Sequence, residues 1–400
     1  MRVLFLNHNV VRKGGTFFRA YHIARHLVSL GHQVTLLSIS ANRLVVFERE
    51  MDDGVEIIHT PDLLWGLGRT GWDIWDTFRR IQFLHGKSWD IIHAWDCRPV
   101  VIIPAIYARH QSRIAGGKLV IDWCDWWGRG GTQSERPDNL LKSLYSPIET
   151  FFEESFRTKA DGTTLASELL QKRAVELGVP ANNIIILPGG ADTKIISPVN
   201  RHHARQKLGL SPDEWIVGYM GALSAKEVDL LVETMRIVRG DLPQVRLLAI
   251  GVAVAGSRKS FRETVGNKWE NWITETGRIP FNDVLNYLGA CDALILPMQN
   301  TLSNRARWPS KINDYLAAGR PVVASRVGEV AALLEKYHAG LLAEDNPFAL
   351  AQMLLKLSNN KILATSYGDN GRILAEGDLN WITLVKGLIA YYGRILNVHK

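Results

Sequence analysis

Cysteine is scarce in this 400-residue chain, which contains only three. Cys97, Cys124 and Cys291 are an odd number, form no CxxC pair and have no histidine at ligand spacing. This pattern argues against a disulfide framework and gives no support to a zinc site. We therefore expect a reduced, cytoplasmic compartment.

Long hydrophobic runs are also missing. The stretch from Val100 to Ala108 contains a proline and falls well short of the roughly 20 apolar residues that a membrane-spanning helix needs. The segment from Met1 to Gly15 lacks the charged region, the longer apolar region and the cleavage site of a signal peptide. Any membrane contact is therefore expected to be peripheral, at the inner, cytoplasmic surface.

No block of charge of one sign dominates the sequence. The 47 basic and 40 acidic residues leave a formal net charge of +7, and the basic residues are dispersed. No RNA- or DNA-binding module is recognisable, so no nucleic-acid partner is expected. The positive balance suits phosphorylated substrates or an anionic membrane surface without selecting either.

What the sequence does contain is a repeated alternation of strand-like and helix-like segments. Met1 to Asn7 predicts a buried strand, Thr16 to Leu30 a helix, and Gln33 to Ile39 a second strand. This order implies a parallel sheet with a right-handed crossover. The alternation loosens between Pro188 and Pro198 and restarts at Ile216.

The length and the interrupted pattern predict two domains, because a single core rarely grows to 400 residues. We predict an α/β fold of two Rossmann-like, doubly wound domains, residues 1–190 and 198–375, that face each other across a cleft. A final helix over 381–397 is expected to pack back on the first domain.

The loop between the first strand and the first helix is rich in glycine. Gly14, Gly15 and Thr16 place backbone N–H groups at a helix N-terminus, which favours an anion. The loop matches neither GxGxxG nor GxxxxGK[ST], so nicotinamide dinucleotide and Walker-type ATP binding lose their main support. A phosphate site is the functional interpretation and a structural tight turn is the alternative.

The segment from Pro309 to Ser325, PSKINDYLAAGRPVVAS, carries the strongest functional signal. Ser310 and Lys311 open a predicted helix, where a hydroxyl, an ammonium and N–H groups converge on a diphosphate. Asp314 lies one turn further along. An ordinary amphipathic helix followed by a buried strand explains the apolar residues but not this polar start.

Together with GGTFFRAYHIARHL, GHQVTLLS, DIIHAWD, GYMGALSAKEVDLLVETM and GRIPFNDVLNYLGACDALILP, this segment resembles the retaining GT-B glycosyltransferases of family 4. The resemblance covers essentially the whole chain in order and spacing, and it implies that the first domain binds the acceptor and the second the nucleotide sugar. It implies transfer of a sugar from a nucleoside diphosphate sugar, UDP- or GDP-linked, to an acceptor hydroxyl with retention at the anomeric carbon. We expect no further cofactor and, because lysines, arginines and helix N-termini already supply positive charge, no obligatory metal.

The resemblance also assigns roles to individual residues of the donor site. Lys226 would neutralise the leaving diphosphate, and Asp314 would hold the ribose hydroxyls. The strand end from Gly277 to Ile279 would hold the base, through Arg278 and Ile279. A solvated surface lysine is the alternative interpretation of Lys226.

Three departures from the family pattern limit this assignment. Ala222 stands where members usually have an arginine after a glycine, and we hypothesise that Arg305 or Arg307 supplies the charge. Ala306 stands in place of the first acid of a two-glutamate signature, and Asp314 is the second acid. Since the first acid normally contacts the donor sugar, the resemblance does not indicate which sugar is transferred. Cys124 and Asp125 stand where the family often places His-Asp.

Candidate catalytic residues therefore follow the strands of the first domain. Asp125 is the first candidate for a carboxylate at the reacting centre and Asp122 the second, and no third ligand suggests a metal beside them. His93, in DIIHAWD, is the other candidate, although a core histidine is an equally good interpretation.

The aromatic side chains that could stack on an acceptor sugar follow the same strand. We predict acceptor contacts for Trp123, Trp126, Trp127 and Arg129, with ordinary packing as the alternative. The segment from Leu64 to Arg80 mixes Trp, Leu and Arg and is interpreted as an interfacial helix, a lid or a plain surface helix.

The sequence leaves three functions open. The first is a glycosyltransferase acting on a glycan, lipid-linked or small-molecule acceptor. The second is a catalytically weakened protein that binds a nucleotide sugar or polysaccharide and regulates a partner. The third is a nucleotide-sugar epimerase, which shares the architecture but consumes no acceptor.

Overall fold

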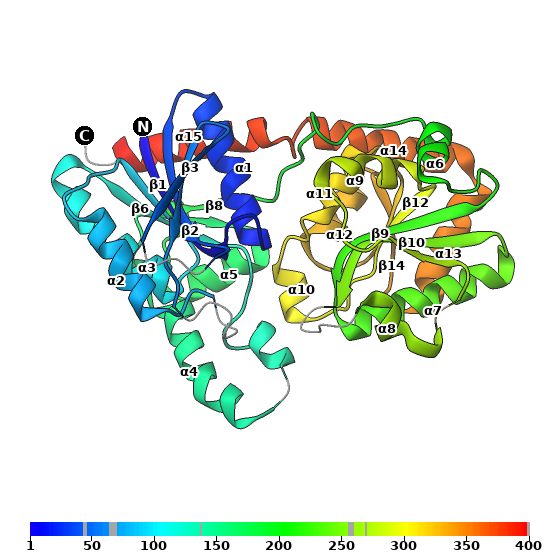
Figure 1. The fold of residues 1–400 in the computed structure, drawn as a ribbon, viewed down its shortest axis with the longest axis horizontal. Coiled ribbons are helices and arrows are strands. Elements are labelled where there is room, and N and C mark those ends of the chain that lie inside the picture. The colour runs from blue at the N-terminus through cyan, green and yellow to red at the C-terminus, as the bar shows by residue number, and fades with distance from the viewer. Residues whose placement is uncertain (43–45, 64–69, 137, 255–259, 269, 398–400) are drawn as a thin grey trace. The chain divides into compact units, whose positions relative to one another are not determined.

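The structure is a computed structural model that describes the chain except residues 43–45, 64–69, 137, 255–259, 269 and 398–400. Its residues form two compact units (Figure 1). The first comprises Met1–Pro188, Ala306–Trp308 and Trp381–Lys400, and the second comprises Gly189–Arg305 and Pro309–Asn380. Each unit has its own largely parallel sheet, which confirms the predicted α/β class.

The first unit is built on an eight-stranded sheet in the order β3-β4-β2-β1-β5-β6-β7-β8. In the described part of the chain, the edge strand β3 alone runs antiparallel to its neighbour. The strands are β1 (Arg2–Val10), β2 (Gln33–Ile39), β3 (Glu48–Asp52), β4 (Val55–Thr60), β5 (Ile91–Trp95), β6 (Lys118–Trp123), β7 (Gly162–Leu165) and β8 (Ile184–Ile186).

Helices cover both faces of this sheet. They are α1 (Gly15–Ser29), α2 (Ile74–Leu84), α3 (Pro99–Ser112), α4 (Leu140–Ser155), α5 (Glu168–Glu176) and α15 (Trp381–Asn397). The side chains of Asp73, Asn139 and Ser167 accept backbone N–H groups at the starts of α2, α4 and α5. These caps explain where the three helices begin.

Successive residues of β1 face opposite sides of the sheet, as the pleat requires. Val3 and Phe5 pack with residues of α1 and α15, and Leu4 and Leu6 pack with residues of α3. A strand that is buried on both faces reads as a nearly continuous apolar run, which is why β1 is recognisable in the sequence. The helix α15 thus belongs to the core of the first unit.

The second unit contains a six-stranded parallel sheet in the order β11-β10-β9-β12-β13-β14. The strands are β9 (Trp215–Leu223), β10 (Val245–Val254), β11 (Ile273–Glu275), β12 (Ala293–Leu296), β13 (Val322–Ser325) and β14 (Gly340–Ala343). The helices are α6 (Arg201–Leu208), α7 (Ala225–Asp241), α8 (Phe261–Val265), α9 (Phe281–Ala290), α10 (Leu302–Ala306), α11 (Lys311–Ala317), α12 (Gly328–Lys336), α13 (Pro347–Asn359) and α14 (Lys361–Glu376). Residues of α7 and α13 share one core with this sheet.

Two expectations from the sequence need adjustment. The strand expected to reach Ile279 ends at Glu275, because Gly277 adopts a φ of 62° that turns the chain out of the sheet. In the segment from Leu64 to Arg80, residues 64–69 lie outside the described residues and α2 begins at Ile74. Among the helices that the structure describes, none combines the length and apolar character needed to cross a bilayer.

Candidate functional site

A polar cavity of about 160 Å³ lies at the carboxyl ends of β1, β5 and β6 in the first unit. Strands β1 and β5 are neighbours, but the chain leaves β1 for β2 on its other side. Such a topological switch point is where open α/β sheets bind ligands. The cavity lining includes the carboxylates of Asp96, Asp122 and Asp125 and the guanidinium groups of Arg98 and Arg136.

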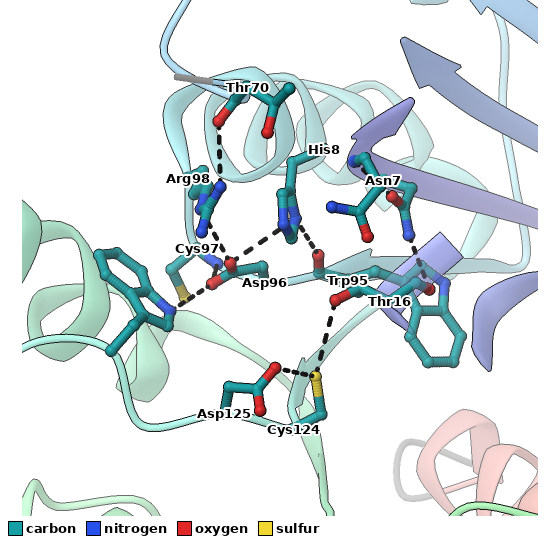
Figure 2. A network of polar contacts seen from close by, with 12 residues as sticks. Asn7, His8, Thr16, Thr70, Trp95, Asp96, Cys97, Arg98, Cys124 and Asp125 are labelled. Carbon is teal, nitrogen blue, oxygen red and sulfur yellow. Dashed lines mark hydrogen bonds and ion pairs between the residues drawn. The ribbon is translucent and has the colours of Figure 1, made fainter. Parts of the chain in front are cut away.

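Asp96 directly follows β5 and has a φ of 107°, a strained value for a residue other than glycine. Its Oδ1 accepts hydrogen bonds from its neighbour Cys97 N at 2.6 Å and from Trp127 Nε1 at 3.0 Å. Its Oδ2 lies 3.3 Å from Arg98 Nε and 3.6 Å from His8 Nδ1 (Figure 2). These contacts fix the carboxylate at the centre of the network.

His8 lies near the end of β1, against the same carboxylate. Its Nδ1 is 3.3 Å from the carbonyl oxygen of Trp95, so this nitrogen carries the proton and donates it (Figure 2). Burial, and then the charge of Arg98, lower the pKa of His8 to about 3. The ring is therefore neutral at physiological pH, with an unprotonated Nε2 that can accept a hydrogen bond.

Sequence reasoning missed both His8 and Asp96 as site residues. The available signal was their place, since each is a polar residue at the end of a strand of apolar residues. Asp125, which the sequence did single out, borders the cavity and is exposed. Its Oδ2 accepts a weak hydrogen bond from Cys124 Sγ at 3.5 Å, and that sulfur lies 3.8 Å from Thr16 Oγ1 (Figure 2).

Asp122 also touches the cavity, but its charge is already paired. It is buried, lies 3.2 Å from Arg19 through Oδ1, and accepts a hydrogen bond from Thr164 Oγ1 at 2.5 Å. Arg19 in turn donates to the carbonyl oxygens of Leu187 and Pro188. Asp122 thus anchors α1 to the sheet, which weakens its case as a catalytic acid.

The prediction that His93 faces the reacting centre is wrong. The ring is fully buried, with Nδ1 at 2.6 Å from Tyr392 Oη and Nε2 at 3.1 Å from Thr164 Oγ1. Burial lowers the pKa of His93 well below its usual value. This histidine is a neutral core residue that connects β5 to β7 and α15.

The predicted aromatic acceptor platform is also largely buried. Trp123 donates through Nε1 to the carbonyl oxygen of Asp125 and to Glu153, and Arg157 covers its ring at 4.1 Å. Trp123 is buried but lines the cavity, so its predicted acceptor contact stays a prediction. Trp127 is buried but borders the cavity.

The other two predicted acceptor residues lie beside each other. Trp126 is half-buried and donates through Nε1 to the carbonyl oxygen of Arg129, which is exposed. Arg129 lies outside the cavity lining and faces a second hollow beside α4. Their acceptor roles stay predictions.

The glycine loop before α1 is shaped as a tight turn. Gly14 has a φ of 81°, and an added Cβ would lie 2.7 Å from Asn9 Oδ1. That same Oδ1 accepts the backbone N–H of Phe17, while Thr16 is buried and accepts Asn7 Nδ2 through its carbonyl oxygen. The side chain of Asn9 thus uses one of the N–H groups expected for a phosphate.

In the second unit, charged residues gather after β9 and at the start of α11. Lys311 Nζ contacts the hydroxyl of Tyr219 and lies 3.2 Å from the carbonyl oxygen of Ala222. Lys226 is exposed in the first turn of α7. Asp314 is half-buried in α11, and burial, with a smaller effect of the Asp192 carboxylate, raises its pKa to about 7.

The remaining predicted donor residues are placed as follows. Ser310 is exposed and its hydroxyl makes no capping hydrogen bond to α11. Arg278 is exposed and Ile279 half-buried in the loop between β11 and α9. Arg305 is exposed in the last turn of α10, whereas Arg307 is grouped with the first unit.

No metal centre is evident among the residues that the structure describes. Within that part of the chain, no group of three or more His, Cys, Asp or Glu side chains is arranged to hold an ion. The positive groups available near the candidate donor residues are side-chain ammonium and guanidinium groups.

The Arg19–Asp122 pair yields a stability prediction. Arg19→Met leaves a buried carboxylate without its charge partner, which should lower the free energy of unfolding by about 3–5 kcal/mol. Arg25→Met is the matched control on α1, because Arg25 pairs with the exposed Asp53 at 3.4 Å and should cost about 1 kcal/mol or less. Urea unfolding measures both, and equal losses would contradict the structural role of the buried pair.

Two family models match the chain. A model described as "Glycosyl transferase 4-like domain" matches residues 14–190, and one described as "Glycosyl transferases group 1" matches residues 214–360. The first range contains β2 to β8 of the first sheet, and the second contains β9 to β14, the whole of the second sheet.

Curated proteins with related sequences align with only part of this chain. The putative teichuronic acid biosynthesis glycosyltransferase TuaH of Bacillus subtilis is 21% identical over 71% of this chain and 68% of its own length. A D-inositol 3-phosphate glycosyltransferase of Segniliparus rotundus is 26% identical over 60% of this chain and 52% of its own. An uncharacterized glycosyltransferase of Methanocaldococcus jannaschii is 30% identical over 29% of this chain. The aligned part of the chain thus spans between 32% and 68% of the length of these relatives.

Solved structures share the fold over nearly the whole chain. A glycosyltransferase from Rickettsia africae superposes with a TM-score of 0.73 at 17% identity, covering 99% of both chains. Sucrose-phosphate synthase from Thermosynechococcus elongatus gives 0.72 at 17%, covering 98% of both. Anabaena HepE in complex with UDP-glucose gives 0.72 at 17%, covering 98% of this chain and all of that one. With a glycosyl transferase model matching each half and this fold throughout, the chain belongs to the group 1 glycosyltransferases of the GT-B fold.

Proposed function

We propose that this protein transfers a sugar from a nucleoside diphosphate sugar to an acceptor hydroxyl, with retention at the anomeric carbon. The observation that carries the proposal is the polar cavity at the switch point of the first sheet. It is supported by the ligands of a structural neighbour, since Anabaena HepE was solved with UDP and with UDP-glucose. The Segniliparus relative, a D-inositol 3-phosphate glycosyltransferase, supports a hydroxyl-bearing acceptor.

The donor is proposed to bind the second unit. Lys311 and Lys226 stabilise negative charge on the departing diphosphate, and Arg278 helps to hold the base. Asp314 accepts hydrogen bonds from the ribose hydroxyls, and the backbone at Ile279 holds the base. A UDP- or GDP-sugar fits this proposal, with no obligatory metal.

The acceptor is proposed to enter the cavity of the first unit. His8 Nε2 accepts a hydrogen bond from an acceptor hydroxyl, and Asp125 is the carboxylate nearest to solvent. In the reaction the bond from the anomeric carbon to the diphosphate oxygen breaks and a bond to the acceptor oxygen forms. The acceptor hydroxyl loses its proton, and Asp125 is the proposed group that assists this loss.

A screen of nucleotide sugars tests the proposal. UDP-, GDP-, ADP- and TDP-sugars are added in a thermal-shift experiment, and the true donor should raise the unfolding temperature because it binds the folded state. The same donor, with a panel of methyl glycosides and lipid-linked sugars, should release free nucleoside diphosphate. Interconversion of the sugar without an acceptor would instead identify an epimerase, and binding without turnover a regulatory protein.

The half-buried Asp314 gives a pH prediction. The ionised carboxylate is proposed to accept hydrogen bonds from the ribose hydroxyls. With a pKa of about 7, most protein molecules carry this ionised form at pH 8 and few do at pH 6. The dissociation constant of the best donor should therefore rise roughly tenfold from pH 8 to pH 6. Asp314→Asn should flatten this profile, whereas Asp213→Asn, at an exposed site of the same unit, should leave it intact. A profile unchanged by Asp314→Asn would remove this residue from the donor site.

Peripheral membrane contact is a further part of the proposal, because a lipid-linked acceptor lies at a membrane surface. The helix α4 exposes Leu140, Leu144, Ile148 and Phe151 along one side, with 46–76% of each residue accessible. Trp72, just before α2, packs edge to face on Phe152 of α4, and Ile74 and Phe78 of α2 are also exposed. Exposed apolar side chains on neighbouring helices favour insertion into a headgroup layer.

Vesicle binding tests this contact. The protein should cosediment with phosphatidylglycerol-containing vesicles, and the double variant Leu144→Ser, Ile148→Ser should lose most of that binding. The control is Ile362→Ser, since Ile362 is also apolar and even more exposed than Leu144 and Ile148 but lies on α14 of the second unit. Equal cosedimentation of the two variants would exclude α4 as the membrane-contacting helix.

A further inference from the structure

The end of β9 holds the ammonium group of Lys311 in one place. Nζ donates to the hydroxyl of Tyr219 and lies 3.2 Å from the carbonyl oxygen of Ala222. It also lies 4.4 Å from the centre of the Tyr219 ring, within the range of a cation–π contact. Three contacts from one strand thus fix a side chain that comes from α11, 92 positions away in the sequence.

Tyr219 is shaped to receive this ammonium. The residue is buried, and its hydroxyl donates to the carbonyl oxygen of Ala222 at 2.7 Å. Because the phenol proton is used in that bond, the oxygen presents a lone pair to Lys311. Phenol and carbonyl oxygens are both uncharged, so these contacts position the positive charge without neutralising it.

Lys311 passes beside Gly221, a residue that the backbone conformation requires. Its φ of 91° is one that side-chain-bearing residues rarely adopt. A Cβ added there would meet Lys311 Cε at 3.7 Å and Nζ at 3.9 Å. These are ordinary van der Waals distances, so the lysine passes close to this position and brings its ammonium to the backbone of position 222.

The surroundings of this ammonium favour an anion. The helix α7 begins at Ala225, so the positive end of a 17-residue helix lies just beyond Ala222. The acid in its first turn, Glu227, is held by the N–H and hydroxyl of Ser224 in a capping box and by Asn304 Nδ2 at 3.3 Å. The neighbouring Lys226 is exposed.

We propose that Tyr219 is a positioning residue that holds Lys311 at the backbone of Ala222, so that this lysine supplies the diphosphate-binding charge that an arginine at position 222 would carry. The inference rests on the proposed function, since it concerns the same donor. It replaces the hypothesis that Arg305 or Arg307 compensates for Ala222. Arg307 is grouped with the first unit, and Arg305 lies in the last turn of α10.

Calorimetric binding of UDP, GDP and uridine to the full chain tests the inference. Tyr219→Phe should weaken binding of the preferred diphosphate roughly threefold to tenfold, the effect of losing one hydrogen bond. Uridine has no phosphate, so its affinity should not change; a merely structural role would weaken both ligands. In a Lys311→Ala background, Tyr219→Phe should have no further effect, because the group that it positions is gone.

Two further variants complete the design. Tyr315→Phe is the matched control, since the hydroxyl of Tyr315 is buried at the same junction of β9 and α11 but accepts Met220 N at 2.8 Å; diphosphate affinity should not change. Ala222→Arg in the Lys311→Ala background should restore binding by returning a cation to the same place. Thermal unfolding of every variant verifies that it is folded.

The possible failures are distinguishable. If the unmodified protein binds neither UDP nor GDP, or if Lys311→Ala binds both normally, the proposed donor site is wrong and the inference falls with it. The donor site can stand while the positioning role of Tyr219 fails. This is the conclusion if Tyr219→Phe leaves diphosphate binding unchanged, or if it weakens diphosphate binding equally with and without Lys311.

Discussion

Parallel strands that lie side by side end at the same edge of their sheet, and the position of every candidate functional residue follows from this constraint. In the first unit, His8 lies near the end of β1, Asp96 follows β5, and Asp125 follows β6. In the second unit, Ala222 lies near the end of β9, where α7 brings Lys226. Strand interiors are buried on both faces, so polar chemistry is confined to these ends.

Small differences in position along a strand decide whether a polar residue serves the fold or a ligand. Asp122 and Asp125 are three residues apart, yet Asp122 is still within β6 and is buried against Arg19, while Asp125 has left the sheet and is exposed. His93 and His8 differ in the same way. His93 lies in the middle of β5 and is fully buried, whereas His8 is close to the end of β1 and borders the cavity.

The sequence predicted the regular elements well where apolar runs are continuous. The strand Gln33–Ile39 has the predicted limits, and the α/β class is correct. The edge strand β3 was not predicted, because Glu48–Asp52 is polar and its pairing with β4 comes from chain proximity rather than burial. Local patterns report burial, and an exposed edge strand gives little such signal.

The candidate site was harder to predict than the fold, because its contacts join distant positions. The contact between His8 and Asp96 spans 88 positions, and it depends on the register of β1 against β5. A single sequence does not specify such registers. The sequence placed Lys311 at the start of a helix, as the structure does, but could not indicate that Tyr219 and Ala222 receive its ammonium.

The strained backbone of Asp96 has a consequence for how this protein can change. A φ of 107° costs an aspartate on the order of 1–3 kcal/mol, a cost that glycine would not incur. Selection for thermal robustness alone would therefore favour glycine at this position, and the central carboxylate of the cavity would disappear. The substitution that relieves the backbone strain at residue 96 would also remove the carboxylate that contacts His8.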